Sequence, residues 1–135
     1  MSDGMSVYRE QRTAAMINPR PHKKLIVWQK AIELVTEIYK MTDGFPRKEE
    51  FGLTAQMRRA AVSVPSNIAE GLTRKTNKDK LHFMNMAQAS LSEIDTQVEI
   101  ALQLGYMSEE TYGGLEKKLV EVQMLLSGLS RSIAH

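Results

Sequence analysis

The chain of 135 residues contains no cysteine, and only 6% of its residues are aromatic. The absence of cysteine excludes disulfides, thiolate metal sites and cysteine nucleophiles, so nothing in the sequence requires an oxidising compartment. No apolar run is long enough to span a bilayer, and the first residues lack the apolar block of a secretory signal. We therefore expect a cytoplasmic protein that does not enter a membrane.

Catalytic and metal-binding patterns are also missing. His22, His82 and His135 are far apart, and none has the Glu-x-x-His spacing that builds di-iron sites in helix bundles. Glu93 and Asp95 are two residues apart on a helical pattern and point in different directions, as on a solvated acidic face. There is no glycine-rich phosphate loop and no Ser/His/Asp set. The sequence predicts no catalytic residue, metal or cofactor, and favours a protein that is not an enzyme.

What the sequence does contain is helical periodicity. Four segments, beginning near Leu25, Pro46, Asn77 and Ser108, repeat apolar residues every three or four positions, and no strand pattern separates them. Because the connections are short, consecutive helices must run antiparallel. We predict an all-α protein, an antiparallel up-down-up-down four-helix bundle formed by residues 23–135, preceded by a flexible N-terminal arm, residues 1–22.

The third helix shows the clearest apolar stripe of the chain and the first helix a steady one, and we expect both to face the core. The stripes comprise Trp28, Ala31/Ile32, Val35 and Ile38/Tyr39 in the first helix, and Met84, Ala87, Leu91, Ile94, Val98 and Ala101 in the third.

Glycines and short polar residues mark the predicted helix ends. Gly44 is expected to end the first helix in a left-handed conformation, and Gly105 to end the third. Pro46 suits the first turn of the second helix. Thr76 or Asn77 is predicted to cap the third helix, and Ser108 the fourth.

The second helix carries short polar side chains on one face and a proline in its middle. Pro65 is expected to kink the helix, with Ser63 or Ser66 donating to the carbonyl of Ala61 that the proline leaves free. Two interpretations remain open, namely a kinked core helix with a polar outer side, or a helix packed on both sides, one of them a subunit or ligand contact. For the second, the predicted subunit interface consists of Gln56, Arg58, Arg59, Ser63, Asn67 and Glu70, in which Arg59 would pair with Glu70 or with an acid of another chain.

Charge is unevenly distributed along the chain. Residues 1–80 carry 15 Lys and Arg against 9 Asp and Glu, whereas residues 81–135 carry 3 against 7. Such asymmetry either pairs two surfaces of one assembly or presents a basic surface to a polyanion; a plainly solvated end is the other interpretation. In an up-down bundle one pole would gather the predicted nucleic-acid-binding residues Lys23, Lys24, Lys30, Arg74, Lys75, Lys78 and Lys80, with Arg47 and Lys48 at the other pole.

Several motifs resemble one known family, the four-helix bundle proteins also called 23S rRNA intervening-sequence proteins. The resemblance covers about residues 23–134 and leaves out residues 1–22. It is carried by Val27–Ala31, Phe45-Pro46, Glu50–Thr54, the long segment Gln56–Gly71, Ala87–Glu93 and Leu104–Tyr106.

The resemblance implies properties that the residue patterns alone do not. Members of this bacterial family form homopentameric rings, and some are encoded in insertions within large-subunit rRNA genes. A related branch, the accessory variability protein of diversity-generating retroelements, binds nucleic acid and a reverse transcriptase.

We therefore predict a non-enzymatic, ring-forming protein that binds RNA or DNA, with homopentamer subunits and nucleic acid as its partners. One alternative is an adaptor of a diversity-generating retroelement that binds a reverse transcriptase and its RNA. The other is a purely structural oligomer.

Overall fold

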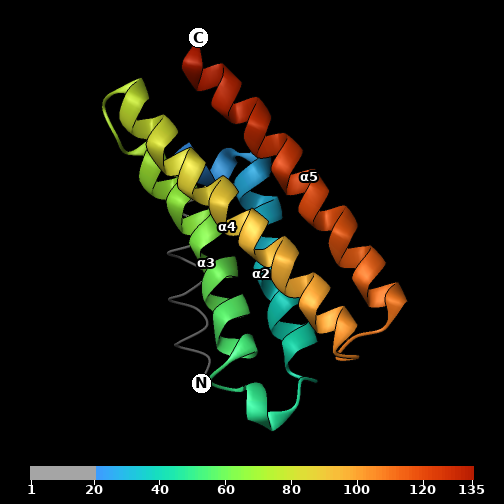
Figure 1. The fold of residues 1–135 in the computed structure, drawn as a ribbon. Coiled ribbons are helices and arrows are strands. Elements are labelled where there is room, and N and C mark those ends of the chain that lie inside the picture. The colour runs from blue at the N-terminus through green and yellow to red at the C-terminus, as the bar shows by residue number, and fades with distance from the viewer. Residues whose placement is uncertain (1–20) are drawn as a thin grey trace, which may run out of the picture.

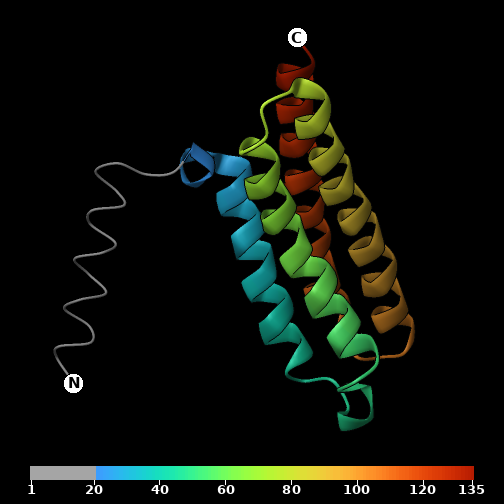
Figure 2. The ribbon, with the colours of Figure 1, turned by 90° about the vertical axis from the view of Figure 1, so that its left-hand side faces the viewer.

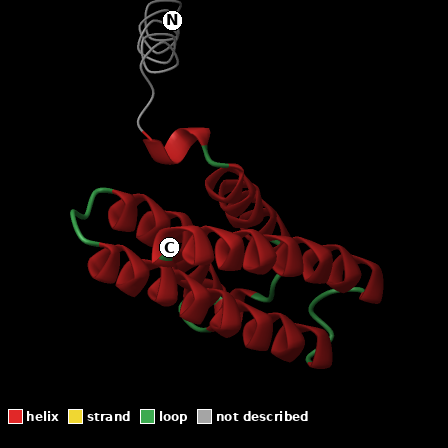
Figure 3. Ribbon diagram, turned by 90° about the horizontal axis from the view of Figure 1, so that it is seen from above, coloured by secondary structure: helices red, strands yellow, loops and turns green. Residues whose placement is uncertain are grey.

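The computed structural model describes residues 21–135, all of which fold into helices and the turns between them (Figure 1). Viewed from above, the described part of the chain shows helices and loops and no strand (Figure 3). The elements are η1 (Pro21–Lys24), α2 (Ile26–Thr42), η2 (Arg47–Glu49), α3 (Leu53–Leu72), α4 (Asn77–Gln103) and α5 (Glu109–Ala134). The remainder of the predicted arm, residues 1–20, lies outside the described residues.

The four long helices form the predicted antiparallel bundle. Each lies beside the next along the chain and α5 also lies beside α2, whereas the backbones of the diagonal pairs α2/α4 and α3/α5 do not approach each other closely. The chain runs alternately up and down the bundle (Figure 2). As a result, η1, the α3–α4 connection and the C-terminus share one end, while η2 and the α4–α5 connection share the other (Figures 1 and 2).

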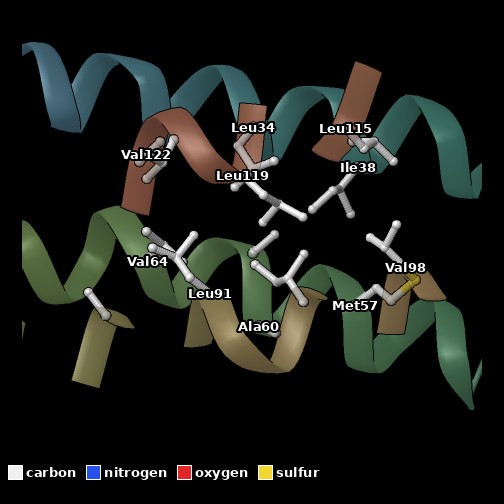
Figure 4. Packing of buried hydrophobic residues seen from close by; sticks show 14 of the residues in the cluster. Leu34, Ile38, Met57, Ala60, Val64, Leu91, Val98, Leu115, Leu119 and Val122 are labelled. Atoms are coloured by element: carbon white, nitrogen blue, oxygen red, sulfur yellow. The ribbon is translucent and has the colours of Figure 1, made fainter. Parts of the chain in front are cut away.

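A single apolar core runs along the bundle axis. Figure 4 shows side chains from all four helices meeting there, among them Leu34 of α2, Val64 of α3, Leu91 of α4 and Leu119 of α5. The stripe predicted for the third helix is confirmed, because every one of its six residues is fully buried.

The stripe predicted for the first helix is displaced by about one residue. The buried positions of α2 are Val27, Ala31, Leu34, Ile38 and Thr42. Of the other stripe positions, Trp28 and Val35 are half-buried, whereas Ile32 and Tyr39 are exposed. α2 packs against both α3 and α5, so its core face is centred between these two neighbours. Each of these four positions follows a buried position by one residue, which is a rotation of about 100° around the helix axis. This rotation places their side chains on the outer side of the α2–α3 contact.

The first helix does not end as predicted at Gly44. Among the described residues, only Gly105 has a positive φ, of 77°, so the left-handed stop is confirmed there and is wrong at Gly44. The hydroxyl of Thr42 and the guanidinium of Arg58 both donate to the carbonyl of Tyr39, at 3.2 Å each. Because side chains already satisfy this end of α2, it needs no left-handed residue.

The second helix begins later than predicted. Pro46 precedes the short helix η2, and α3 starts only at Leu53. The carboxylate of Glu49 accepts the N–H of Leu53 at 3.2 Å and the hydroxyl of Tyr106 at 2.8 Å. The Tyr106 ring in turn packs on Phe45, with 5.1 Å between ring centroids. Glu49 therefore caps α3 and ties it to the α4–α5 connection.

The other two predicted caps are confirmed. Thr76 accepts the N–H of Asp79 at 3.1 Å, which begins α4, and Ser108 accepts the N–H of Thr111 at 3.1 Å, which begins α5. These bonds set where the α3–α4 and α4–α5 connections end.

Pro65 does not interrupt α3, which continues as one helix to Leu72. The two serines nearby donate to other carbonyls than the one predicted: Ser66 bonds that of Val62 at 2.8 Å, and Ser63 bonds that of Ala60 at 2.7 Å. The expectation that Ser63 or Ser66 donates to the carbonyl of Ala61 was therefore wrong. Ser63 reaches the carbonyl three residues before it, and Ser66 the carbonyl four residues before it. The kink itself stays a prediction.

Within residues 21–135, none of the helices combines the length and the apolar character that crossing a bilayer requires.

Candidate nucleic-acid interface

Lysines and arginines gather at the end of the bundle formed by η1, the α3–α4 connection and the first turns of α4. We call this end the basic pole; it comprises Lys23, Lys24, Arg74, Lys75, Lys78 and Lys80. Two carboxylates also lie there, those of Glu70 and Asp79, so positive charge is in excess.

Three of these lysines are available to a ligand. Lys24, Lys75 and Lys78 are exposed and form no ion pair within the described part of the chain. Lys23 and Lys80 are half-buried and likewise form none within residues 21–135. An ammonium with no carboxylate beside it can bind a phosphate without first breaking an internal ion pair.

Two of the predicted cations are already engaged inside the chain. Arg74 pairs with Glu70 at 2.6 Å and lies over the ring of Phe83, 4.7 Å from its centroid. Lys30, about one turn into α2, pairs at 3.6 Å with Glu33. Glu33 also bonds Lys118 of α5 at 2.7 Å, which lowers the pKa of Glu33. Lys30 thus belongs to the α2–α5 contact rather than to the basic pole.

Sequence patterns missed one cation of this end. Arg131 is exposed in the last turn of α5, and α5 ends beside the α3–α4 connection (Figures 1 and 2). Its position follows from the up-down topology, which places the end of a fourth helix at the same pole as the end of the second.

The α3–α4 connection is held by a close approach of the two helices. Gly71 is buried, and a Cβ built on it would lie 2.7 Å from Cε of Met84, 2.9 Å from Cβ of Phe83 and 3.2 Å from the carbonyl oxygen of Lys80. Only glycine fits such a contact. It fixes where the connection emerges and therefore where Arg74 and Lys75 are presented.

The short polar residues of α3 lie along a groove between α3 and α4. The hydroxyl of Ser63 bonds that of Ser90 on α4, and the amide of Asn67 donates to the carbonyl of Ser63 at 2.8 Å. Part of the close packing expected on this stripe is therefore supplied by α4 of the same chain. The α3–α4 groove is lined by Gln56, Arg59, Ala60, Ser63 and Asn67 of α3 and by Met86, Ser90 and Glu93 of α4.

Two residues of the predicted subunit interface have partners within the chain. Arg58 bonds Thr42 at 2.9 Å and the carboxylate of Asp43 at 2.9 Å, so it joins α3 to the end of α2. Glu70 pairs with Arg74 and not with Arg59. Arg59 is exposed and has no ion pair within residues 21–135.

No group of three or more His, Asp or Glu side chains suited to a metal ion occurs among the described residues. The hydroxyl of Tyr112 donates a hydrogen bond to Glu99 at 2.9 Å, which raises the pKa of Tyr112 to about 12. This bond links α5 to α4 and lies at the pole opposite the basic one.

Comparisons with known proteins bear on the fold and on the family of this chain. A comparison with curated proteins gives no match. Among solved structures, the chain is similar to a crystal structure of a protein of unknown function from the S23 ribosomal protein family of Bacteroides thetaiotaomicron, with a TM-score of 0.70 and 23% identity over 78% of this chain and 98% of that one. At this identity the similarity shows the fold alone.

The family profile described as 23S rRNA-intervening sequence protein matches residues 23–128. That range includes all of α2, α3 and α4, and most of α5. The chain therefore belongs to the 23S rRNA-intervening sequence protein family.

Proposed function

We propose that this chain is a non-enzymatic, cytoplasmic protein that binds RNA or DNA through phosphate contacts at the basic pole, and that it does so as a homopentameric ring. The observation that carries the proposal is the set of three exposed lysines without ion pairs, Lys24, Lys75 and Lys78, presented on η1, the α3–α4 connection and the start of α4. Repetition around a ring would multiply a weak contact into useful affinity.

The geometry favours lysine over arginine as the phosphate ligand. Arg74 would have to leave Glu70, 2.6 Å away, before it reached a phosphate, whereas Lys75 and Lys78 have no such competitor within the described residues. Lysine contacts phosphates as a point charge and does not select a base, so the proposed binding is indifferent to sequence.

A binding titration tests this proposal. Fluorescence anisotropy of labelled single-stranded and duplex RNA and DNA is followed at low salt for the wild type, for Lys75→Glu/Lys78→Glu and for the control Lys40→Glu. Lys40 is exposed near the end of α2, at the other pole, so its reversal changes charge without touching the proposed site. Removing one lysine–phosphate interaction costs on the order of 1 kcal/mol, so the double variant should bind roughly tenfold to a hundredfold more weakly.

Two outcomes would reject the binding proposal. One is the absence of binding to any of the four nucleic acids at low salt, which would favour the purely structural oligomer. The other is an equal loss of affinity in Lys40→Glu and the double variant, which would mean that only net charge matters. The adaptor role toward a reverse transcriptase remains an alternative that rests on the family resemblance alone.

The proposed ring contact is the α3–α4 groove. Its support is Arg59, exposed and without an ion pair in the described range, beside Met86, of which 43% is exposed. Gln56 and Asn67 offer further hydrogen bonds along the same groove. Arg58 and Glu70 contribute less, because both already bind within the chain.

Sedimentation velocity at micromolar concentration tests the ring. A homopentamer is expected for the wild type and for Lys40→Glu, and smaller species for Arg59→Glu, in which a like charge would face the acidic groups of a neighbour. A single subunit for the wild type would contradict the ring, and so would an Arg59→Glu variant that stays pentameric.

A further inference from the structure

Three planar side chains lie together at the basic pole. We call them the planar cluster; it consists of Arg74, His82 and Phe83. The guanidinium of Arg74 lies over the ring of Phe83, 4.7 Å from the ring centroid. The imidazole of His82 packs edge-on against the same ring, with 5.4 Å between the ring centroids and 78° between the two planes. Phe83 is half-buried, whereas Arg74 and His82 are exposed. The cluster is therefore a held aromatic ring with two exposed planar groups beside it.

The guanidinium of Arg74 is fixed in orientation without being enclosed. It donates to the carboxylate of Glu70 at 2.6 Å, and a carboxylate meets a guanidinium at its edge, in the plane of the group. The ring of Phe83 covers one face of that plane. Even so, 40% of the Arg74 side chain is exposed, which leaves the other face to solvent. Two contacts thus hold Arg74 where a further flat group can stack on it.

This arrangement suits an uncharged flat group better than a phosphate. The carboxylate of Glu70 would repel a phosphate that approached the guanidinium of Arg74. A nucleobase is planar and uncharged, and unpaired bases stack on guanidinium planes as well as on aromatic rings. The phosphates of the same strand would be bound close by, because Lys75 follows Arg74 in the chain and Lys78 lies one turn of α4 before His82.

Unpaired strands offer free base faces, and duplexes do not. Within a duplex each base is covered on both faces by its neighbours, and exposing it requires unstacking and unpairing. We propose that the basic pole binds single-stranded RNA or DNA in preference to a duplex, by stacking an unpaired base on Arg74 of the planar cluster. This inference rests on the proposed nucleic-acid binding and names the class of nucleic acid. Such stacking tolerates any sequence, because every base has a flat face.

The planar cluster lies outside the proposed ring contact. In the lining of the α3–α4 groove, the residues nearest to the basic pole are Asn67 of α3 and Met86 of α4. Arg74 lies beyond the end of α3, and His82 lies one turn of α4 before Met86. The ring contact therefore does not use the cluster, and a ring would repeat it once in each subunit.

Replacing Arg74 by lysine tests the stacking, because lysine keeps the charge and removes the plane. Arg131→Lys is the matched control, since Arg131 is exposed at the same pole and lies over no aromatic ring of the described residues. Fluorescence anisotropy at low salt is followed for a labelled single-stranded DNA, for the same strand with abasic sites in place of its bases, and for the duplex. A single-stranded RNA of the same sequence is included as well.

The intact and abasic strands carry the same phosphates, so their difference measures what the bases contribute. The wild type should bind the intact DNA strand roughly tenfold more tightly than the abasic strand, and more tightly than the duplex. Arg74→Lys should lose this advantage while its binding to the abasic strand and the duplex stays unchanged, which also shows that the variant is folded. The RNA strand should respond like the DNA strand, because stacking does not involve the 2′-hydroxyl. Arg131→Lys should match the wild type on every probe.

Failure of this inference is distinguishable from failure of the proposed function. Three results would refute the stacking and leave phosphate binding intact: equal binding of intact and abasic strands by the wild type, tighter binding of the duplex than of the single strand, or an Arg74→Lys variant that still prefers the intact strand. The first two need no variant. Absence of binding to all four probes would refute both proposals.

Discussion

Replacing Gly71 by alanine tests the packing that positions the basic pole. The added methyl would lie 2.7 Å from Cε of Met84, 2.9 Å from Cβ of Phe83 and 3.2 Å from the carbonyl oxygen of Lys80. Cε of Met84 is the end of a flexible side chain and can shift, but the Cβ of Phe83 and the carbonyl oxygen of Lys80 are fixed by the backbone of α4. The ends of α3 and α4 must therefore separate.

The expected cost follows from two opposing effects. Overpacking of this kind costs about 1–3 kcal/mol. Alanine in a helix recovers up to about 1 kcal/mol over glycine, and less near a helix end. The net loss should be about 1–2 kcal/mol, which lowers the melting temperature by roughly 4–8 °C for a chain of this length.

Two other glycines provide matched controls. A Cβ built on Gly113 or Gly114, both within α5, would meet no atom within 4 Å. Gly113→Ala and Gly114→Ala should therefore stabilise the protein by up to about 1 kcal/mol. Thermal and urea unfolding followed by circular dichroism measures all three. A Gly71→Ala variant as stable as the wild type, or stabilised like the controls, would refute the argument.

Three further predictions concern the helix ends. Arg58→Met should destabilise the fold by about 1–3 kcal/mol in urea unfolding, because the end of α2 loses its bonds to the guanidinium; Arg58→Lys should not restore them all, and full rescue by lysine would contradict this role. Thr76→Ala should cost about 0.5–2 kcal/mol by loss of the α4 cap, and an unchanged urea midpoint would refute it. Tyr106→Phe should melt below the wild type by a margin that depends on pH. The hydroxyl of Tyr106 lowers the pKa of Glu49, and Glu49 raises that of Tyr106. The margin is therefore full between the ordinary pKa values of 4.5 and 10.0, and shrinks as pH falls through the lowered pKa or rises through the raised one; a margin independent of pH would exclude the carboxylate as its cause.

The fold was predictable because the signals that form each helix lie within that helix and at its ends. The stripe from Met84 to Ala101 and the caps Thr76 and Ser108 depend on local spacing and local hydrogen bonds, and these are what a sequence displays. Gly44 and the α2 stripe were less predictable, since their environment depends on residues distant in the chain. Arg58, 19 positions from Tyr39, completes the end of α2 and so removes the need for a left-handed glycine.

The candidate site was predictable in location but not in detail. Topology alone brings Lys23, Lys75 and Lys78 to one end of an up-down bundle, and the structure places them there. The ion pair between Arg74 and Glu70 joins neighbouring turns at the end of α3. It could not be predicted, because the sequence alone does not give the exact residue at which α3 ends. Arg131 was not predicted, because it lies in the last turn of the final helix and not at a helix start or in a loop.

The salt dependence of binding is the most direct measurement of the proposed function. For a ligand held by phosphate contacts, the logarithm of the binding constant falls linearly with the logarithm of salt concentration, by about 0.7–0.9 per contact. Lys75→Gln/Lys78→Gln should therefore reduce the slope by roughly 1.4–1.8 per subunit in contact with the ligand. A slope equal to that of the wild type would show that nucleic acid is bound elsewhere, or not through phosphates, and would contradict the account.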